Sequence, residues 1–281
     1  MGALNTPWRR FTQSITHVAL ILIAVLALAP LVWVVSTSIK DITEVATTPP
    51  TFLPAHPTIR PYLDLWSKAP YLLYTRNSTL VAISSAALAL TISCLAAYGM
   101  ARYRFKGVKV VLSIFLLSQM FPGASILIPV TRTVMKLGMY NTLAGLGLVY
   151  AAFFVPFSSW MLYGYFRAIP RELDEAAHMD GCSRMGILTR IIIPLTVPGL
   201  AATFVFSFLG AWNEFLFALV LTNQNSVRTL PVGVQALIGQ YMTDWNLLCS
   251  SAIIFAIPPL VLFFLFEKAL LRGLTAGAVK G

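Results

Sequence analysis

The sequence predicts an all-α fold that crosses a membrane six times, and three observations lead to this prediction. Hydrophobic residues make up 58% of the 281 residues, while charged residues make up only 11%, against roughly 25% in a typical soluble domain. The mean hydropathy is +0.78. The charges gather in short segments between long apolar intervals. This composition excludes a monomeric soluble enzyme and a disordered chain, and it favours an integral membrane protein.

The apolar intervals place the spans. Each interval is continuously apolar and long enough for one helix of about 20 residues, whereas barrel strands alternate over about 10 residues. Glu214 is the one acidic residue inside these intervals, since Glu267 falls only at the end of the last span. The predicted spans, in a single transmembrane domain covering 1–281, are about 15–38, 77–101, 110–131, 144–166, 198–221 and 246–267.

The charge balance gives the orientation rather than a nucleic-acid site. The net charge is +10, but the Lys and Arg residues lie between apolar intervals instead of along one face. Most of them fall on the side that carries both termini, which the positive-inside rule places in the cytoplasm. The cysteines Cys94, Cys182 and Cys249 have no metal-ligand spacing, so we expect no metal site and treat them as packing residues.

The most informative loop is 167–194, on the predicted cytoplasmic side. Pro170 suits the first turn of a helix, and the acids Glu172, Asp174 and Glu175 favour its positive end. Leu173, Ala176 and Ala177 share one small apolar face, and Gly181 supplies the stop. From the residues alone, this helix is either a rigid projection that docks on another surface or a solvated connector.

A motif in this loop carries a resemblance to a known family. Glu175-Ala176-Ala177, followed by Asp180-Gly181 and Ile193-Pro194-Leu195, is similar to the EAA motif of ABC-importer permeases, with Cys182 where many members carry Ala. The resemblance implies a type I ABC importer permease architecture. It also implies that residues 170–188 form a coupling helix seated in a separate ATPase subunit. The residues then assigned to coupling are Glu175, Ala176, Ala177, Asp180, Gly181 and Pro194.

Two further segments resemble the carbohydrate-importer branch, of the maltose type. They are Ala211-Trp212-Asn213-Glu214-Phe215-Leu216 and Arg272-Gly273-Leu274-Thr275-Ala276-Gly277-Ala278-Val279-Lys280-Gly281, which lies in the C-terminal tail, 268–281. In the tail, the resemblance implies contact with the ATPase through Thr275, Gly277 and Lys280. It implies import of a sugar or oligosaccharide, maltose- or trehalose-like, across a bacterial or archaeal cytoplasmic (inner) membrane. The partners implied are a second homologous permease, two ATPase subunits and an extracytoplasmic sugar-binding protein, with the sugar and the lipid bilayer as ligands.

The sequence lacks the phosphate-binding loop that an ATPase needs, since no Gly-x-x-x-x-Gly-Lys-Ser/Thr occurs. We therefore expect no cofactor on this chain, with ATP and Mg bound by a partner, and no enzymatic activity. A membrane enzyme would also need a nucleophile, an acid–base pair or a metal cluster. The competing hypothesis is a self-contained secondary transporter or channel, which calls for internal repeats and paired ionisable residues in the spans.

Candidate substrate contacts lie at Glu214 and its neighbours. A charge inside a span is costly and marks a functional site by default. Glu214 can line a polar cavity with Trp212 and Asn213, pair structurally with a polar group on another helix, or act as a proton relay, for which no His partner is evident. Asn77 and Gln119 are the secondary cavity candidates, because other polar residues in the spans suit interhelical hydrogen bonds.

Overall fold

The computed structural model describes residues 7–103, 106–239 and 243–278. This part of the chain is helical and contains no strand, only an isolated antiparallel bridge between Ile238 and Thr243. It forms two compact units. The first contains the chain up to Ala69 together with Ala236–Ile254, and the second contains Pro70–Gln235 and the chain from Phe255 onward. The predicted all-α class is confirmed.

Four helices are long and apolar enough to cross a membrane, and two bent pairs raise the number to as many as six in the described residues. The four are α1 (Pro7–Ser38), α4 (Tyr71–Arg102), α7 (Leu143–Ala168) and α14 (Trp245–Ala278). One bent pair is α5 (Val108–Ser118) with α6 (Gly123–Lys136), at 99°; the other joins Arg184–Leu195 to α11 (Val197–Asn213), at 82°.

The third predicted span, 110–131, is therefore broken rather than straight. Helix α5 ends at Ser118, and Pro122 precedes α6 in an extended conformation. Proline has no N–H to continue a helical ladder, and it disfavours the helical conformation in the residue before it. The fifth predicted span, 198–221, is likewise divided, because α11 ends at Asn213 and α12 (Leu216–Leu221) begins two residues after Glu214.

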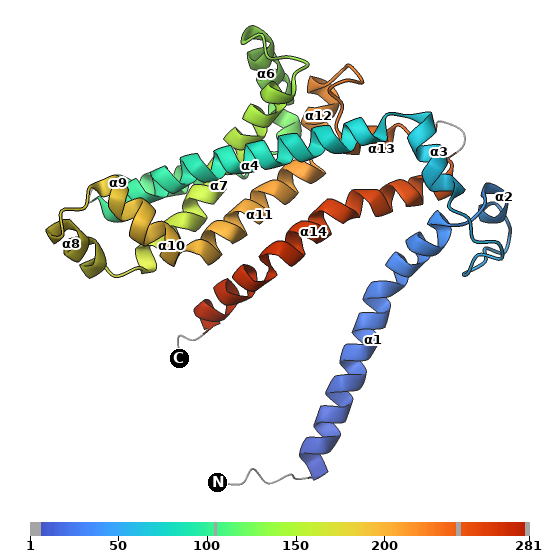
Figure 1. The fold of residues 1–281 in the computed structure, drawn as a ribbon, viewed down its shortest axis with the longest axis horizontal. Helices are drawn as coiled ribbons and strands as arrows, with labels where there is room; N and C mark the ends of the chain where they lie inside the picture. The colour runs from blue at the N-terminus through green and yellow to red at the C-terminus, as the bar shows by residue number, and fades with distance from the viewer. Residues whose placement is uncertain (1–6, 104–105, 240–242, 279–281) are drawn as a thin grey trace. The chain divides into compact units, whose positions relative to one another are not determined.

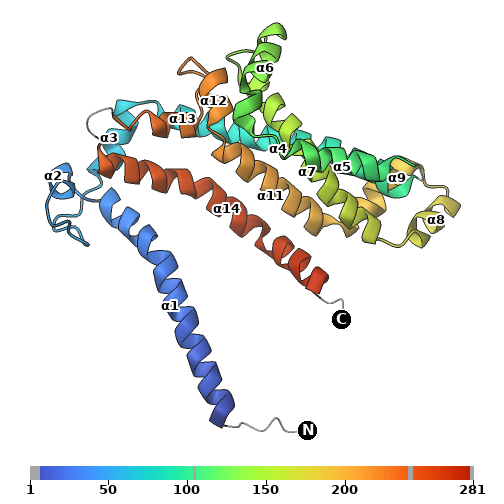
Figure 2. The same cartoon turned by 180° about the vertical axis from the view of Figure 1, so that it is seen from behind.

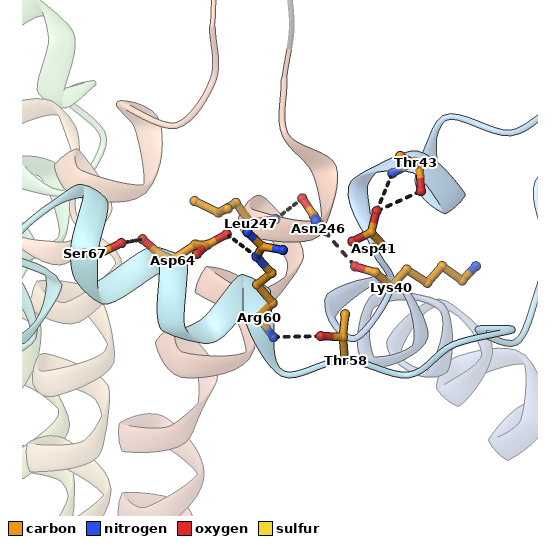
Figure 3. A network of polar contacts seen from close by, with 9 residues as sticks. All are labelled: Lys40, Asp41, Thr43, Thr58, Arg60, Asp64, Ser67, Asn246 and Leu247. Carbon is orange, nitrogen blue, oxygen red and sulfur yellow. Dashed lines mark hydrogen bonds and ion pairs between the residues drawn. The ribbon is translucent and has the colours of Figure 1, made fainter.

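The first unit contains a cap that is more helical than its prolines suggest. It holds α2 (Ile42–Val45) and α3 (Arg60–Lys68), whose first turn accommodates Pro61. The Lys40 ammonium donates to the Thr51 carbonyl and lies 5.1 Å from the centroid of the Trp33 ring. Figure 3 shows the polar network beside it, in which Asn246 Nδ2 donates to the Lys40 carbonyl at 3.4 Å.

Two carboxylates of this cap are held by backbone donors. The Thr43 N–H donates to Asp41 Oδ1 at 3.0 Å, and the Ala55 N–H donates to Glu44 Oε1 at 2.8 Å. These bonds favour the charged form, and they hold the pKa of both carboxyl groups below the ordinary value. Local polar contacts therefore fasten this part of the cap.

The core of the second unit is formed by α4, α7 and α11, which lie side by side in both views (Figures 1 and 2). Alanines such as Ala82, Ala86 and Ala89 are fully buried on α4, which allows close helix approach. A Cβ added to Gly199 of α11 would lie 2.5 Å from Cγ of Tyr165 on α7. The absence of a side chain at Gly199 therefore makes room for the Tyr165 ring.

Candidate functional site

The loop between α7 and α11 contains the short helix that the sequence predicts, α8 (Glu172–Met179). Its first turn carries Glu172, Asp174 and Glu175, which interact favourably with the positive end of the helix dipole. Its carboxyl end is closed by two bonds, from the Gly181 N–H to His178 O at 3.0 Å and from the Cys182 N–H to Ala177 O at 2.9 Å. This is the Schellman pattern, and Gly181 supplies its left-handed residue with φ +80°.

Only one of the three residues on the predicted apolar face of α8 is buried. Ala177 joins a buried cluster with Leu162 and Phe166 of α7 and with Ile187. Leu173 and Ala176 are exposed instead. Helix α8 therefore contacts the cluster through the methyl group of Ala177. Because this side chain is small, the α8 backbone can lie close to α7.

Polar side chains attach α8 to the C-terminal ends of α4 and α7. Arg102, the last residue of α4, places its Nε 2.8 Å from Asp174 Oδ2, and the two side chains are only 6% and 19% exposed. Arg102 Nη1 also donates to Ile169 O at 3.0 Å, and Arg171 Nη2 donates to Ala101 O at 3.1 Å. Ala101 lies in the last turn of α4 and Ile169 directly follows α7, so both guanidinium groups bind carbonyls at helix C-termini.

Burial and the neighbouring arginines act in opposite directions on the charge of the Asp174 carboxyl group. Burial raises its pKa above the ordinary value, and the guanidinium groups of Arg102 and Arg171 act in the opposite direction. Sequence reasoning missed Arg102 as an anchor. The available signal was a basic residue in the last turn of a helix, but basic residues between spans also indicate membrane orientation.

The rest of the loop continues as α9 (Arg184–Ile187), the π-helical turn η1 (Leu188–Ile192) and α10 (Ile193–Leu195). Ser183 caps α9 by accepting from the Gly186 N–H at 3.2 Å, and Tyr98 of α4 donates to Arg184 O at 3.2 Å. Pro194 sits in the first turn of α10. Since proline cannot donate to a helical ladder, the wide turn η1 directly before it suits that interruption.

The outer surface of α8 is exposed and chemically mixed. Met179 is 88% exposed, Leu173 is 42% exposed, and Glu175 and Asp180 are also exposed. Methionine is frequent at protein-binding surfaces because its side chain is flexible and polarizable. The geometry therefore gives a rigid projection with an apolar and acidic tip.

Glu214 lies at the break between α11 and α12, where its carboxylate is fully engaged. Oε1 accepts from the Phe217 N–H at 2.9 Å, and Oε2 accepts from the Ala218 N–H at 3.1 Å and from the Tyr150 hydroxyl at 2.5 Å. The carboxylate thus satisfies two of the free N–H groups at the start of α12. This geometry matches the structural pairing among the predicted roles.

The neighbours of Glu214 divide between core and surface. Trp212 is fully buried, stacked on Phe208 with the ring centroids 5.8 Å apart, and its indole N–H donates to Phe255 O at 3.2 Å. This conformation leaves no indole surface for a ligand. Asn213 is exposed, and its Nδ2 donates to Leu209 O at 2.7 Å.

The two secondary candidates also differ. Asn77 is 2% exposed, and its Nδ2 donates to Ser226 O and Arg228 O at 3.0 and 2.9 Å. It holds the segment before α13 (Leu230–Gln235) against α4. Gln119 is exposed at the α5–α6 break, where it lines an apolar pocket of about 360 Å³ with Phe153 and Pro156.

The remaining predictions concern the C-terminal tail and metal binding. Lys280 lies outside the described residues, as does the side chain of Thr275, although the backbone of α14 extends past Gly277 to Ala278. Among the described residues, no three His, Cys, Asp or Glu side chains approach closely enough to hold a metal ion.

The fold is shared with a chain of a solved transporter. The crystal structure of a bacterial ABC transporter involved in the import of the acidic polysaccharide alginate matches with a TM-score of 0.82 at 20% identity, over 96% of this chain and 100% of that chain. Residues 89–275 match the family of binding-protein-dependent transport system inner membrane components, and the chain belongs to this family. It is a multi-pass inner-membrane protein, and the family consists of transport permease subunits rather than enzymes.

Relatives extend the similarity over nearly the whole chain. The sulfoquinovosyl glycerol transport system permease protein SmoH of Agrobacterium fabrum is 35% identical, over 96% of this chain and 94% of its own. The trehalose/maltose transport system permease protein MalG of Thermococcus litoralis is 36% identical, over 93% and 94%. The diacetylchitobiose uptake system permease protein DasC of Streptomyces coelicolor is 32% identical, over 90% and 91%. The predicted resemblance to carbohydrate-importer permeases is confirmed.

Proposed function

We propose that this chain is the membrane-spanning subunit of an ATP-driven importer that translocates a sugar or oligosaccharide. The relatives are named for a sulfoquinovosyl glycerol, for trehalose and maltose, and for diacetylchitobiose. All of these solutes are glycosides, and they differ in charge and size. A maltose- or trehalose-like solute is one member of the proposed class.

The observation that carries the proposal is the mounting of α8. Its base is fixed by the Arg102–Asp174 pair and the Ala177 contact, while Met179 stays 88% exposed at its tip. A helix held in this way moves together with the ends of α4 and α7 when a partner pushes on it. We propose that the partner is one of two ATPase subunits, which hydrolyse ATP and drive alternating access, and that Glu175, Asp180 and Gly181 belong to the contact.

The remaining partners follow from the same proposal. They are a second permease with the same fold and an extracytoplasmic binding protein that delivers the sugar from the side opposite α8. In this assignment both termini and the 170–188 coupling helix are cytoplasmic, and the 268–281 tail contacts the ATPases. Glu214, Asn77 and Trp212 maintain the helix packing, whereas Asn213 and Gln119 are the candidates that face the solute.

The competing function, a self-contained secondary transporter, requires an ionisable group free to exchange protons or ions in the spans. Glu214 accepts three hydrogen bonds, so its carboxylate is committed to the start of α12. The geometry therefore favours a subunit driven from outside the membrane.

The test replaces Met179 with Asp in the assembled transporter. We expect the variant to insert and to copurify with the second permease, but to lose copurification of the ATPase subunits and uptake of the sugar. The Met179→Leu variant is the matched control, since it keeps an apolar side chain of similar volume, and it should behave as wild type. Sugar uptake by the chain reconstituted without any ATPase would overturn the proposal, as would undiminished uptake by the Met179→Asp variant.

A further inference from the structure

A basic cleft lies where three helix ends meet in the second unit, beside α8 but apart from its exposed tip. It has a volume of about 890 Å³ and is lined by the end of α4, the beginning of α5 and the end of α7. In these helices the apolar, membrane-crossing segments begin or end. The cleft therefore lies at the level where a lipid headgroup meets the acyl region.

The charges of the cleft have one sign. Five cations line it, namely Arg102, Lys106, Lys109, Arg167 and Arg171, and none of its lining residues is acidic. Asp174 pairs with Arg102, but it does not line the cleft. Among the described residues, Lys106, Lys109 and Arg167 have no ion-pair partner. Such a concentration of like charges in a concave site is stabilised by an anion.

A buried arginine and the start of a helix add to this excess of positive charge. Arg102 is 94% buried as a side chain, since only 6% is exposed, and its Nη2 has no hydrogen-bond partner in the described part of the chain. Helix α5 begins at Val108 with no side-chain cap on its first turn, so its N–H groups there are open to an anion.

The same cleft also has apolar lining residues. Val108 and Leu112 of α5 and Tyr163 of α7 line it together with the cations, and both helices continue into apolar sequence. A free inorganic anion would need only the charged part. An amphiphile with a phosphate group and an acyl chain fits both parts, because long basic side chains can hold the headgroup while the chain follows the helices.

We propose that this cleft binds the phosphate headgroup of an anionic phospholipid. Lys106, Lys109 and Arg167 supply the charge, and Leu112 and Tyr163 contact the first part of the acyl chain. The site is separate from sugar recognition and from ATPase docking, and the proposal does not depend on the orientation of the chain.

The experiment uses the full chain, purified with the subunits that accompany it and transferred to nanodiscs of phosphatidylcholine with or without phosphatidylglycerol. Retained lipid is measured by native mass spectrometry after partial delipidation. We expect wild type to retain phosphatidylglycerol in preference to phosphatidylcholine. The triple variant Lys106→Ala/Lys109→Ala/Arg167→Ala should bind it on the order of a hundredfold more weakly, because each basic residue near a membrane surface contributes roughly fivefold.

Two further variants separate charge from folding. The double variant Arg132→Ala/Lys136→Ala removes two cations from α6 and should leave retention unchanged. The triple variant Lys106→Arg/Lys109→Arg/Arg167→Lys keeps the charge and should retain phosphatidylglycerol. Loss of retention in this charge-conserving variant would contradict a headgroup site defined by charge.

The wild-type protein alone can also overturn the proposal. If it retains both lipids equally, the cleft is not an anionic lipid site. If inorganic phosphate in phosphatidylcholine nanodiscs raises thermal stability as much as phosphatidylglycerol does, the ligand is a free anion and the lipid assignment is wrong. We expect stabilisation by phosphatidylglycerol only, with the increase lost in the alanine triple variant.

Discussion

Replacing Arg102 with Met removes the cation beneath α8 and tests how this helix is held. The guanidinium is 2.8 Å from Asp174 Oδ2, and the two side chains are 6% and 19% exposed. Removing one partner of a buried ion pair costs roughly 3–5 kcal/mol. Because Asp174 is partly exposed, we expect the lower end, about 3 kcal/mol, which corresponds to opening of the loop on the order of a hundredfold more often.

Hydrogen exchange at the end of α8 measures that opening. The Asp180 N–H donates to Ala176 O at 3.0 Å and the Cys182 N–H to Ala177 O at 2.9 Å, so both amides report on the attachment of the helix. Their protection factors should fall about a hundredfold in the Arg102→Met variant at neutral pH. The matched control is Arg184→Met, an exposed arginine of the same loop that lies over the Tyr103 ring, and it should change them little.

The pH dependence of the lost protection tests whether the unpaired Asp174 carboxylate is its cause. Burial raises the pKa of Asp174, and the loss of Arg102 raises it further. A raised carboxyl pKa gives stability that is fully present below the unfolded pKa and is lost as pH rises through the folded pKa. The defect should therefore shrink in acid, and the double variant Arg102→Met/Asp174→Asn should exchange nearly as wild type. A defect that is independent of pH, or a double variant as labile as the single one, would refute the reasoning.

Three further pairs of substitutions test the remaining geometry. Gly181→Val should loosen α8 by about 1–2 kcal/mol from backbone strain at φ +80°, whereas Gly181→Asn should be milder; the protection factor of the Cys182 amide distinguishes them, and equal values would contradict a role for the conformation. Glu214→Ala should lower the free energy of unfolding by roughly 2–3 kcal/mol, because two N–H groups of α12 lose their acceptor, and Tyr150→Phe should lower it by about 1 kcal/mol. Thermal unfolding in detergent compares the two variants. A larger loss of stability in Tyr150→Phe than in Glu214→Ala would contradict the assignment. Gly199→Ala should cost about 1–3 kcal/mol by overpacking, and Tyr165→Leu should relieve it in the double variant; a double variant no better than the single one would show that the ring is not the obstacle.

Local patterns of the sequence predict the helices and the end of α8 well. The apolar intervals locate the long helices because burial in lipid requires continuous apolar sequence. Pro170, the first-turn acids and Gly181 predict α8 because caps and stops depend on neighbouring residues. These features need no knowledge of what packs against them.

The features that sequence reasoning did not find depend on residues far apart in the chain. Arg102 pairs with Asp174 across 72 positions of sequence, as their numbers show, and nothing near either residue indicates the other. A single acidic residue inside an apolar interval also gives the same sequence pattern whether its side chain lines a cavity or caps a short helix. Only the position of Tyr150 beside Glu214 and the break at α12 distinguish the two.

The contact between Gly199 and the Tyr165 ring links the evolution of two positions. Because a methyl group at 199 would lie 2.5 Å from Cγ of the ring, neither residue can change freely while the other is kept. Relatives that carry a larger residue at position 199 should carry a smaller one at 165, and those that keep an aromatic ring should keep the glycine. Covariation of this pair would then be a record of helix spacing that is independent of the transported solute.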